Sequence, residues 1–240
     1  MSSLRKVALA AAFTLTMGGM GLSPAKAATE TWNFNSPTGQ LPNTQNYSST
    51  PDGLIATAAG FASGSLTFGT PTALFGKNDG IENGSLENGL GICGPSCALS
   101  GNTSDEITAG VSFIRVQLPT GSTDVRATIG SVTLGEHFEI FGSTSATSGY
   151  VPVFVNGDAS LQGQSLALGA CPGCTFFAFT AVGVQNSPTD LSAADILLVQ
   201  MTADVSAIPI PGALPLFATG LIGLVLLGWR RKKKAALLNA

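Results

Sequence analysis

The chain has 240 residues, with 11 lysines and arginines against 14 aspartates and glutamates and a formal net charge of −3. Most bases lie near the two ends, so residues 28–207 keep three bases against all fourteen acids, a net charge of −11. A surface that acidic repels phosphate backbones, and nucleic acid is therefore excluded as an expected partner. Charged residues make up only 10% of the chain and glycines number 30, which favours strands and turns over helices.

The first segment has the pattern of a secretory signal peptide. A positively charged start is followed by the apolar, mostly small residues 7–22. Ala25 and Ala27 supply the small side chains that signal peptidase requires, which predicts a leader of residues 1–27 and cleavage before Ala28. We therefore expect export; the alternative is a short N-terminal anchor that is never cut.

Residues 28–203 show the alternation of apolar and polar side chains that predicts β-strands. Turn-forming glycine, asparagine, aspartate and proline separate about ten such runs. The expected strands are 31–34, 54–61, 65–68, 114–118, 125–129, 138–141, 151–155, 165–168, 177–181 and 196–201. Short strands with one apolar face must bury that face against a second sheet. The predicted fold class is therefore all-β, a jelly-roll-like β-sandwich.

One glycine-rich stretch holds candidate calcium ligands, Asp79, Glu82, Glu87 and Asn88. Calcium takes six to eight oxygen ligands and accepts flexible loops. The spacing matches neither an EF-hand nor the glycine-rich nonapeptide of calcium-binding β-helices. The stronger prediction is a solvated acidic loop without metal, and no cofactor is expected.

The four cysteines form two close pairs, Cys93 with Cys97 and Cys171 with Cys174. This spacing would suggest tetrahedral zinc in a cytosolic protein. An exported chain meets an oxidising compartment instead, which favours disulfides. Of the three connectivities that four cysteines allow, we prefer the two local pairings. The Pro-Gly dipeptide of the second pair suits a type II turn, which brings the flanking residues within disulfide reach.

His137 is the only histidine, and on a strand it would share a face with Glu139. A histidine beside a carboxylate could serve as a general base, but it would need an activated nucleophile. No Gly-x-Ser-x-Gly elbow is present. An exposed strand histidine is the simpler interpretation, and the protein is predicted not to be an enzyme.

Beyond the sandwich, a linker over residues 204–212 leads to the uncharged, mostly apolar residues 213–229. At about 1.5 Å rise per residue, this segment is at the short end of what spans a bilayer core as a helix. Residues 230–240 form a basic tail, which begins with the consecutive bases Arg230, Arg231, Lys232, Lys233 and Lys234. By the positive-inside rule these bases stay in the cytoplasm, which predicts a single-pass inner-membrane helix with the sandwich outside.

The linker ends in the motif Pro209, Ile210, Pro211 and Gly212. Two prolines one residue apart cannot join a regular helix or a central strand, because each fixes φ and lacks an N–H. We therefore expect a stiff, extended segment just outside the membrane, where a membrane-embedded protease can bind it.

The C-terminal segment resembles the sorting signal of PEP-CTERM proteins, because it combines a proline motif, a short glycine-bearing span and a terminal basic cluster. It has Ile210 in place of the usual glutamate. The resemblance covers roughly the last thirty residues. It implies processing by an exosortase, a membrane cysteine transpeptidase-like protease. Residues 74–142 also look like an arrangement that recurs in PEP-CTERM surface proteins, through the Leu74–Gly80 and Glu87–Gly91 motifs and the strand around Phe113.

Export and this resemblance predict a non-enzymatic protein of the cell surface or exopolysaccharide matrix of a biofilm. It would lie first in the inner membrane, with signal peptidase and an exosortase-type protease as partners and exopolysaccharide as a candidate partner. The alternatives are a carbohydrate-binding module of the extracellular matrix and a simple single-pass anchored periplasmic protein. A sandwich fold alone does not distinguish these functions.

Overall fold

The computed structural model describes residues 27–63, 66–82, 85–93, 105–183 and 194–206, which lie in one compact unit, Ala27–Ala207. Nearly all of their regular structure is β-strand, with a short 3₁₀ turn at Ala159–Leu161. The strands are β1 (Ala28–Asn33), β2 (Gly39–Leu41), β3 (Thr44–Ser48), β4 (Ile55–Phe61), β5 (Pro71–Thr72), β6 (Leu74–Glu82), β7 (Ser85–Ile92), β8 (Ile107–Thr108), β9 (Phe113–Gln117), β10 (Ser122–Gly130), β11 (His137–Ser143), β12 (Val151–Asp158), β13 (Leu166–Ala167), β14 (Phe176–Val182) and β15 (Asp195–Val205).

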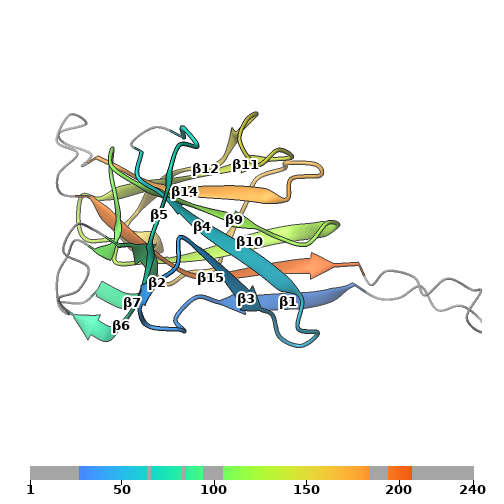
Figure 1. The fold of residues 1–240 in the computed structure, drawn as a ribbon, viewed down its shortest axis with the longest axis horizontal. Helices are drawn as coiled ribbons and strands as arrows, with labels where there is room; N and C mark the ends of the chain where they lie inside the picture. Colours follow the sequence, from blue (N-terminus) through green and yellow to red (C-terminus); the bar gives the residue numbers. More distant parts are fainter. Residues whose placement is uncertain (1–26, 64–65, 83–84, 94–104, 184–193, 207–240) are drawn as a thin grey trace, which may run out of the picture. The chain divides into compact units, whose positions relative to one another are not determined.

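These strands form two antiparallel sheets that pack face to face (Figure 1). The eight-stranded sheet has the order β13-β10-β15-β7-β6-β2, and β1 and β8 also pair with β15. The seven-stranded sheet has the order β12-β11-β14-β9-β4-β3, and β5 pairs with β4. The predicted all-β sandwich is confirmed, with more strands in the described ranges than the ten that we expected.

One large apolar cluster fills the space between the sheets. Alternate residues of each strand supply it, as Phe138 and Ile140 of β11 do, because successive side chains of a strand point to opposite faces. Trp32 is fully buried and donates a hydrogen bond from its indole N–H to the carbonyl of Leu54 at 2.9 Å. Burying such side chains is the main favourable contribution to the stability of the sandwich.

The first and last strands lie side by side, with Ala28 opposite Val205 and Asn33 opposite Gln200 (Figure 1). Thr29 Oγ1 adds a hydrogen bond of 2.5 Å to Asp204 Oδ1. β15 therefore continues past the predicted domain boundary at residue 203. It is paired with β1, β7, β8 and β10, which makes it the most extensively paired strand of the sandwich.

Nine of the ten predicted strands coincide with or overlap observed strands. The exception is 65–68, of which the described residues 66–68 belong to no strand. The largest correction concerns residues 74–92, which form the hairpin β6–β7 instead of a loop. Their glycines mark close backbone approaches: a Cβ on Gly76 would lie 2.0 Å from the carbonyl oxygen of Pro37, and one on Gly91 2.0 Å from that of Asp105.

The predicted targeting segments fall almost entirely outside the described residues. These segments are the leader up to residue 26, the sorting motif 209–212, the apolar span 213–229 and the basic tail 230–240. In the part of the chain that the structure describes, no helix is long and apolar enough to cross a membrane.

Candidate functional site

A cluster of charged side chains is buried in the eight-stranded sheet. Lys77 lies in β6, Glu87 in β7, Glu106 immediately before β8, and Ser131 immediately after β10. In the β6–β7 hairpin, Lys77 is directly opposite Gly89. Glu87 precedes Gly89 by two residues, so the lysine and this glutamate are diagonal neighbours on one face of the hairpin.

The lysine ammonium group binds both glutamates. Lys77 Nζ donates to Glu87 Oε2 at 2.5 Å and to Glu106 Oε1 at 2.6 Å. The side chains of Lys77 and Glu87 are each 9% exposed, and that of Glu106 is 4% exposed. Such close pairing is needed, because an ion withdrawn from water without partners costs several kcal/mol.

Ser131 bridges the two carboxyl groups from another side. Its Oγ lies 2.9 Å from Glu87 Oε1 and 2.9 Å from Glu106 Oε2. The serine has φ of 56°, a left-handed conformation that costs a non-glycine residue roughly 1–3 kcal/mol. A hydroxyl has a single proton to donate, so its contacts with both carboxyl groups are best satisfied when one of them is protonated and donates in return.

The pKa shifts place that proton on Glu106. Burial raises the pKa of Glu106 to about 7, against the opposing hydrogen bond from Lys77. Burial acts on Glu87 in the same direction, but hydrogen bonds from Lys77 and Ser131 hold its pKa below the ordinary value. Burial alone would lower the pKa of Lys77, yet its hydrogen bonds to both glutamates raise it. Below pH 7 the cluster is therefore an ammonium, a carboxylate and a carboxylic acid, with no net charge.

Further acids lie around this cluster. Asp105 and Glu136 are buried, and Asp195, at the start of β15, is half-buried. The Glu136 carboxylate accepts hydrogen bonds from the backbone N–H groups of Thr133 at 2.5 Å and Asp195 at 3.3 Å. Burial raises the pKa of both Glu136 and Asp195. The cluster thus sits in surroundings that disfavour any additional negative charge.

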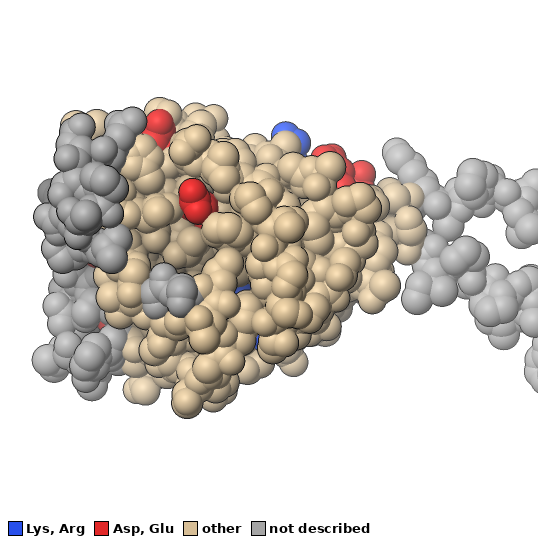
Figure 2. Space-filling model, turned by 90° about the horizontal axis from the view of Figure 1, so that it is seen from above, with Lys and Arg blue, Asp and Glu red and all other residues tan. Residues whose placement is uncertain are grey.

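The buried acids correct the predicted charge of the surface. The acids inside the protein are Glu30, Glu87, Asp105, Glu106 and Glu136. The face shown in Figure 2 carries scattered aspartates and glutamates and a little exposed Lys or Arg among mostly uncharged residues. The net charge of −11 in residues 28–207 therefore overstates how acidic the surface is.

The four calcium candidates lie on the two strands of the hairpin instead of in one solvated loop. Asp79 is exposed, whereas Glu87 is buried against Lys77 and Ser131. Asn88 Oδ1 accepts a hydrogen bond from the Gly80 N–H at 2.7 Å, and the side chain of Glu82 lies outside the described part. Over the described ranges, no three or more histidine, cysteine, aspartate or glutamate side chains are grouped so as to hold a metal ion.

The second cysteine pair forms the predicted local disulfide. Cys171 and Cys174 are bonded, with a Cα–Cα distance of 5.4 Å. The Cys174 N–H donates to the Cys171 carbonyl at 3.0 Å, and Gly173 has φ of 74°, as a type II turn requires. Cys93 follows β7, but its predicted partner Cys97 lies outside the described residues.

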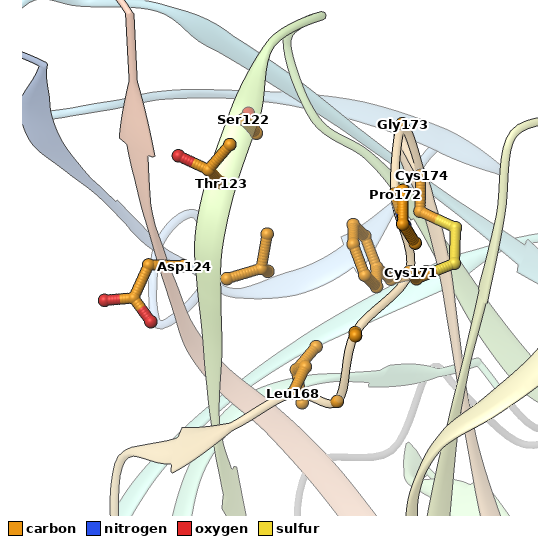
Figure 3. Close-up of a pocket in the computed structure, with 12 residues that line it drawn as sticks. Ser122, Thr123, Asp124, Leu168, Cys171, Pro172, Gly173 and Cys174 are labelled. Atoms are coloured by element: carbon orange, nitrogen blue, oxygen red, sulfur yellow. A yellow bond between two sulfur atoms is a disulfide. The ribbon is translucent and has the colours of Figure 1, made fainter.

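A groove of about 250 Å³ lies beside this disulfide (Figure 3). The start of β10, residues 168–174 and Phe177 line it, and Asp124 is the only charged residue among them. In Figure 3 the side chains of Thr123 and Asp124 point away from the disulfide. The groove is therefore small and mostly lined by uncharged residues, and its lining offers no acid–base pair.

His137 lies in β11 and is half-buried instead of exposed. Its Nδ1 is 3.1 Å from the carbonyl oxygen of Gly157 in the neighbouring strand β12. This contact places the ring against the backbone of the sheet edge. It gives the histidine a structural partner.

A second cationic side chain that is partly shielded from solvent is Arg115 of β9. It lies on the face of the seven-stranded sheet that is turned away from the main core. The rings of Phe61, Phe68 and Phe176 lie 5.2, 5.6 and 5.6 Å from its guanidinium carbon. One Nη donates to the Ala146 carbonyl at 2.8 Å. Burial lowers the pKa of Arg115. These contacts are cation–π interactions of the kind that stabilise a planar guanidinium.

Comparison with known protein families, with curated proteins and with solved structures finds no match to this chain. The site is therefore defined by its own geometry. Sequence reasoning considered Glu87 only as a calcium ligand and missed Lys77, Glu106 and Ser131. The one usable indication was the rarity of bases in residues 28–207, which makes a lysine inside a glycine-rich strand unusual.

Proposed function

We propose that the protein is an exported, non-enzymatic component of the cell surface or exopolysaccharide matrix, processed at its C-terminal tail by an exosortase-type membrane protease. The extent of the folded body carries this proposal. β1 begins at Ala28, the residue that predicted leader cleavage makes the first, and β15 ends at Val205, shortly before the predicted sorting motif at 209–212. Removing both ends would leave every described strand intact.

The pairing of the terminal strands supports the same proposal. Ala28 and Val205 are opposite each other, so the β1–β15 ladder is complete without any residue of the leader or the sorting motif. Trp32 of β1 is buried in the core and anchors this ladder. Cleavage at both ends would therefore leave every described ladder pair and every described core side chain in place.

We also retain the jelly-roll type as the finer fold proposal. The chain passes repeatedly from one sheet to the other, for example between β5 and β6, between β8 and β9 and between β9 and β10. Jelly-roll sandwiches are built from such alternation between two sheets.

The groove beside the disulfide favours a second candidate, a carbohydrate-binding module. Its lining combines the apolar side chains of Leu168 and Phe177 with the hydroxyl-bearing residue Ser122. Small-molecule sites commonly combine an apolar surface with a few polar groups. A pull-down of the protein by the exopolysaccharide of its host tests this candidate, and absence of binding rejects it.

The main proposal is tested by following the two ends of the full-length chain in a host that has an exosortase. Antibodies to the sandwich and to a C-terminal tag should detect, at steady state, an exported body without the tag. Replacing Pro209 and Pro211 with alanine should leave an uncut, tagged precursor in the inner membrane, because the helix can then extend across the site. Serines in place of residues 230–234 should instead let some intact chain cross the membrane. A wild-type protein that keeps its tag would be a simple membrane-anchored protein.

A further inference from the structure

The amine of Lys77 is held against two carboxyl groups in a space from which water is excluded. Its Nζ is 2.5 Å from Glu87 Oε2 and 2.6 Å from Glu106 Oε1, so each carboxyl carbon is only one C–O bond farther away. None of the three side chains is more than 9% exposed. An amine and a carboxylic acid combine to form an amide and water, and the reaction is normally opposed by hydration and free diffusion of both groups. Fixed proximity and exclusion of water remove both obstacles.

We propose that Lys77 and Glu106 become joined by an amide bond between Nζ and Cδ, which the folded protein forms by itself with release of one water. This inference goes beyond the proposed function and does not depend on export or on processing of the tail. The sandwich would then carry a covalent link between two side chains that are distant in the sequence.

The three groups have complementary roles in this reaction. The Glu87 carboxylate accepts one proton from the Lys77 ammonium group, which leaves a neutral amine with a lone pair. The amine attacks Cδ of Glu106, forming the new N–C bond. Glu87 passes its proton to the departing hydroxyl of Glu106 and takes a second one from the nitrogen. The products are one amide N–H, one water and a protonated Glu87, so protons and charge balance.

The geometry distinguishes the roles of the two glutamates. Glu106 is the more deeply buried of the two, and the single hydroxyl proton of Ser131 favours an acid among its carboxyl partners. A carboxylic acid releases its hydroxyl as water after one further proton transfer, whereas a carboxylate is a poor electrophile. Burial of Glu106, which raises its pKa to about 7, supports assigning it the acid form. Glu87 is then the base.

Ser131 positions the two carboxyl groups for this exchange. Its Oγ lies between Glu87 Oε1 and Glu106 Oε2, where it can accept a proton from one and donate a proton to the other. Its left-handed backbone, with φ of 56°, is the conformation that holds the hydroxyl there. Its N–H is fixed to the carbonyl of Leu86, next to the base.

The bond would fasten β6 to the segment that enters β8, across a separation of 29 residues. β8 pairs with β15, so the link would covalently connect the β6–β7 hairpin to the strand that pairs with the last strand of the sandwich. A covalent connection at this point would resist local opening of the hairpin, whose described ladder pairing with β15 is confined to Leu90 with Leu198.

Mass spectrometry of the full-length protein after proteolysis tests the proposal. The wild type should yield two peptides joined through Lys77 and Glu106, lighter by one water than their sum. Lys77→Arg keeps the charge but replaces the amine with a poorly nucleophilic guanidinium, and it should yield no link. Glu106→Gln should yield the same amide with loss of one ammonia in place of water. Because the link forms only in the folded protein, its presence would also show that this variant folds. Glu87→Gln removes the base and should slow formation of the link at least about tenfold, each factor of ten corresponding to about 1.4 kcal/mol in the barrier.

Two results would overturn the proposal. One is recovery of the unlinked Lys77 peptide in full yield from wild-type protein held folded for several days at pH 7, with its Cys171–Cys174 disulfide formed. The other is a link from Lys77 to Glu87, which would reverse the assigned roles. In either case the cluster is an ion pair or a different cross-link, and the proposed export and processing are unaffected.

Discussion

Lys77 and Arg115 each bring a positive charge into the sandwich, one among carboxyl groups and the other among aromatic rings. The lysine binds Glu87 and Glu106 within 2.6 Å, in the eight-stranded sheet. The arginine, on the outer face of the seven-stranded sheet, is surrounded by three phenylalanine rings and the Ala146 carbonyl. The difference follows from the two cations: an ammonium is a compact, strongly hydrated charge, whereas a planar guanidinium is weakly hydrated and stacks on rings.

These two environments should respond differently to change. The lysine cluster contains two carboxyl groups, so its stability depends on the cation and on the protonation of Glu106. The arginine has neutral partners, and removing it leaves no buried charge behind. The predictions below concern protein in which Lys77 has not reacted, so that the non-covalent interactions alone are compared.

The largest effect is expected from Lys77→Met. The substitution preserves the length and apolar stem of the side chain but leaves two carboxyl groups buried without their cation. Breaking a buried pair in this way typically costs about 3–5 kcal/mol of unfolding free energy. Urea denaturation followed by tryptophan fluorescence measures the loss, since Trp32 is buried in the core. Adding Glu87→Gln to Lys77→Met should recover much of the loss, and no recovery would show that the unpaired charge of Glu87 is not its cause.

The next effect is a loss of stability as the pH rises from 5 to 8. Glu106 has a pKa of about 7 in the folded protein and an ordinary value of 4.5, so the folded state binds its proton more tightly. The contribution of Glu106 to the free energy of unfolding is fully present below its ordinary pKa of 4.5 and is lost as the pH rises through 7. The total is roughly 3 kcal/mol. The raised pKa values of Glu136 and Asp195 act in the same direction, whereas the lowered pKa of Glu87 acts only at more acidic pH.

Urea denaturation at several pH values measures how the free energy of unfolding changes with pH, and Glu106→Gln is the matched control. The glutamine keeps the size and a hydrogen-bonding carbonyl but does not titrate, so the variant should lose the part of the pH dependence that Glu106 contributes and keep that of Glu136 and Asp195. A variant that retains the full slope would assign the pH dependence to other groups.

The sequence predicts the strands whose alternation reflects one buried face, and it fails where burial has another cause. β9 and β11 alternate apolar and polar residues because one face of each lies in the main core. β6 and β7 alternate poorly, because glycines at close backbone contacts and the buried charges Lys77 and Glu87 occupy positions where apolar residues were expected. In the sequence, buried ionic residues and glycines at close backbone contacts give the same pattern as a polar loop.

Local chemistry was more predictable than long-range chemistry. The Cys171–Cys174 disulfide could be predicted because four consecutive residues have the sequence pattern of a type II turn. The lysine cluster instead joins residues from β6, β7, the approach to β8 and the end of β10, and no spacing in the sequence encodes that meeting. Nothing in the sequence indicates that Ser131 has a left-handed backbone conformation.

The smallest effect concerns Arg115, and it tests whether the rings stabilise a guanidinium in particular. Arg115→Lys retains a positive charge but loses the planar group that lies near Phe61, Phe68 and Phe176. Cation–π contacts contribute about 0.5–2 kcal/mol, with the lower values at exposed sites, so a loss near 1 kcal/mol is expected for this half-buried group. Arg115→Met should cost a similar amount, because the apolar stem still packs on the rings and no unpaired anion remains. Urea denaturation of both variants beside Lys77→Met completes the comparison between the two cations. If Arg115→Met were as costly as Lys77→Met, the partners of the arginine would have to include a charge, and the contrast between the two sites would not hold.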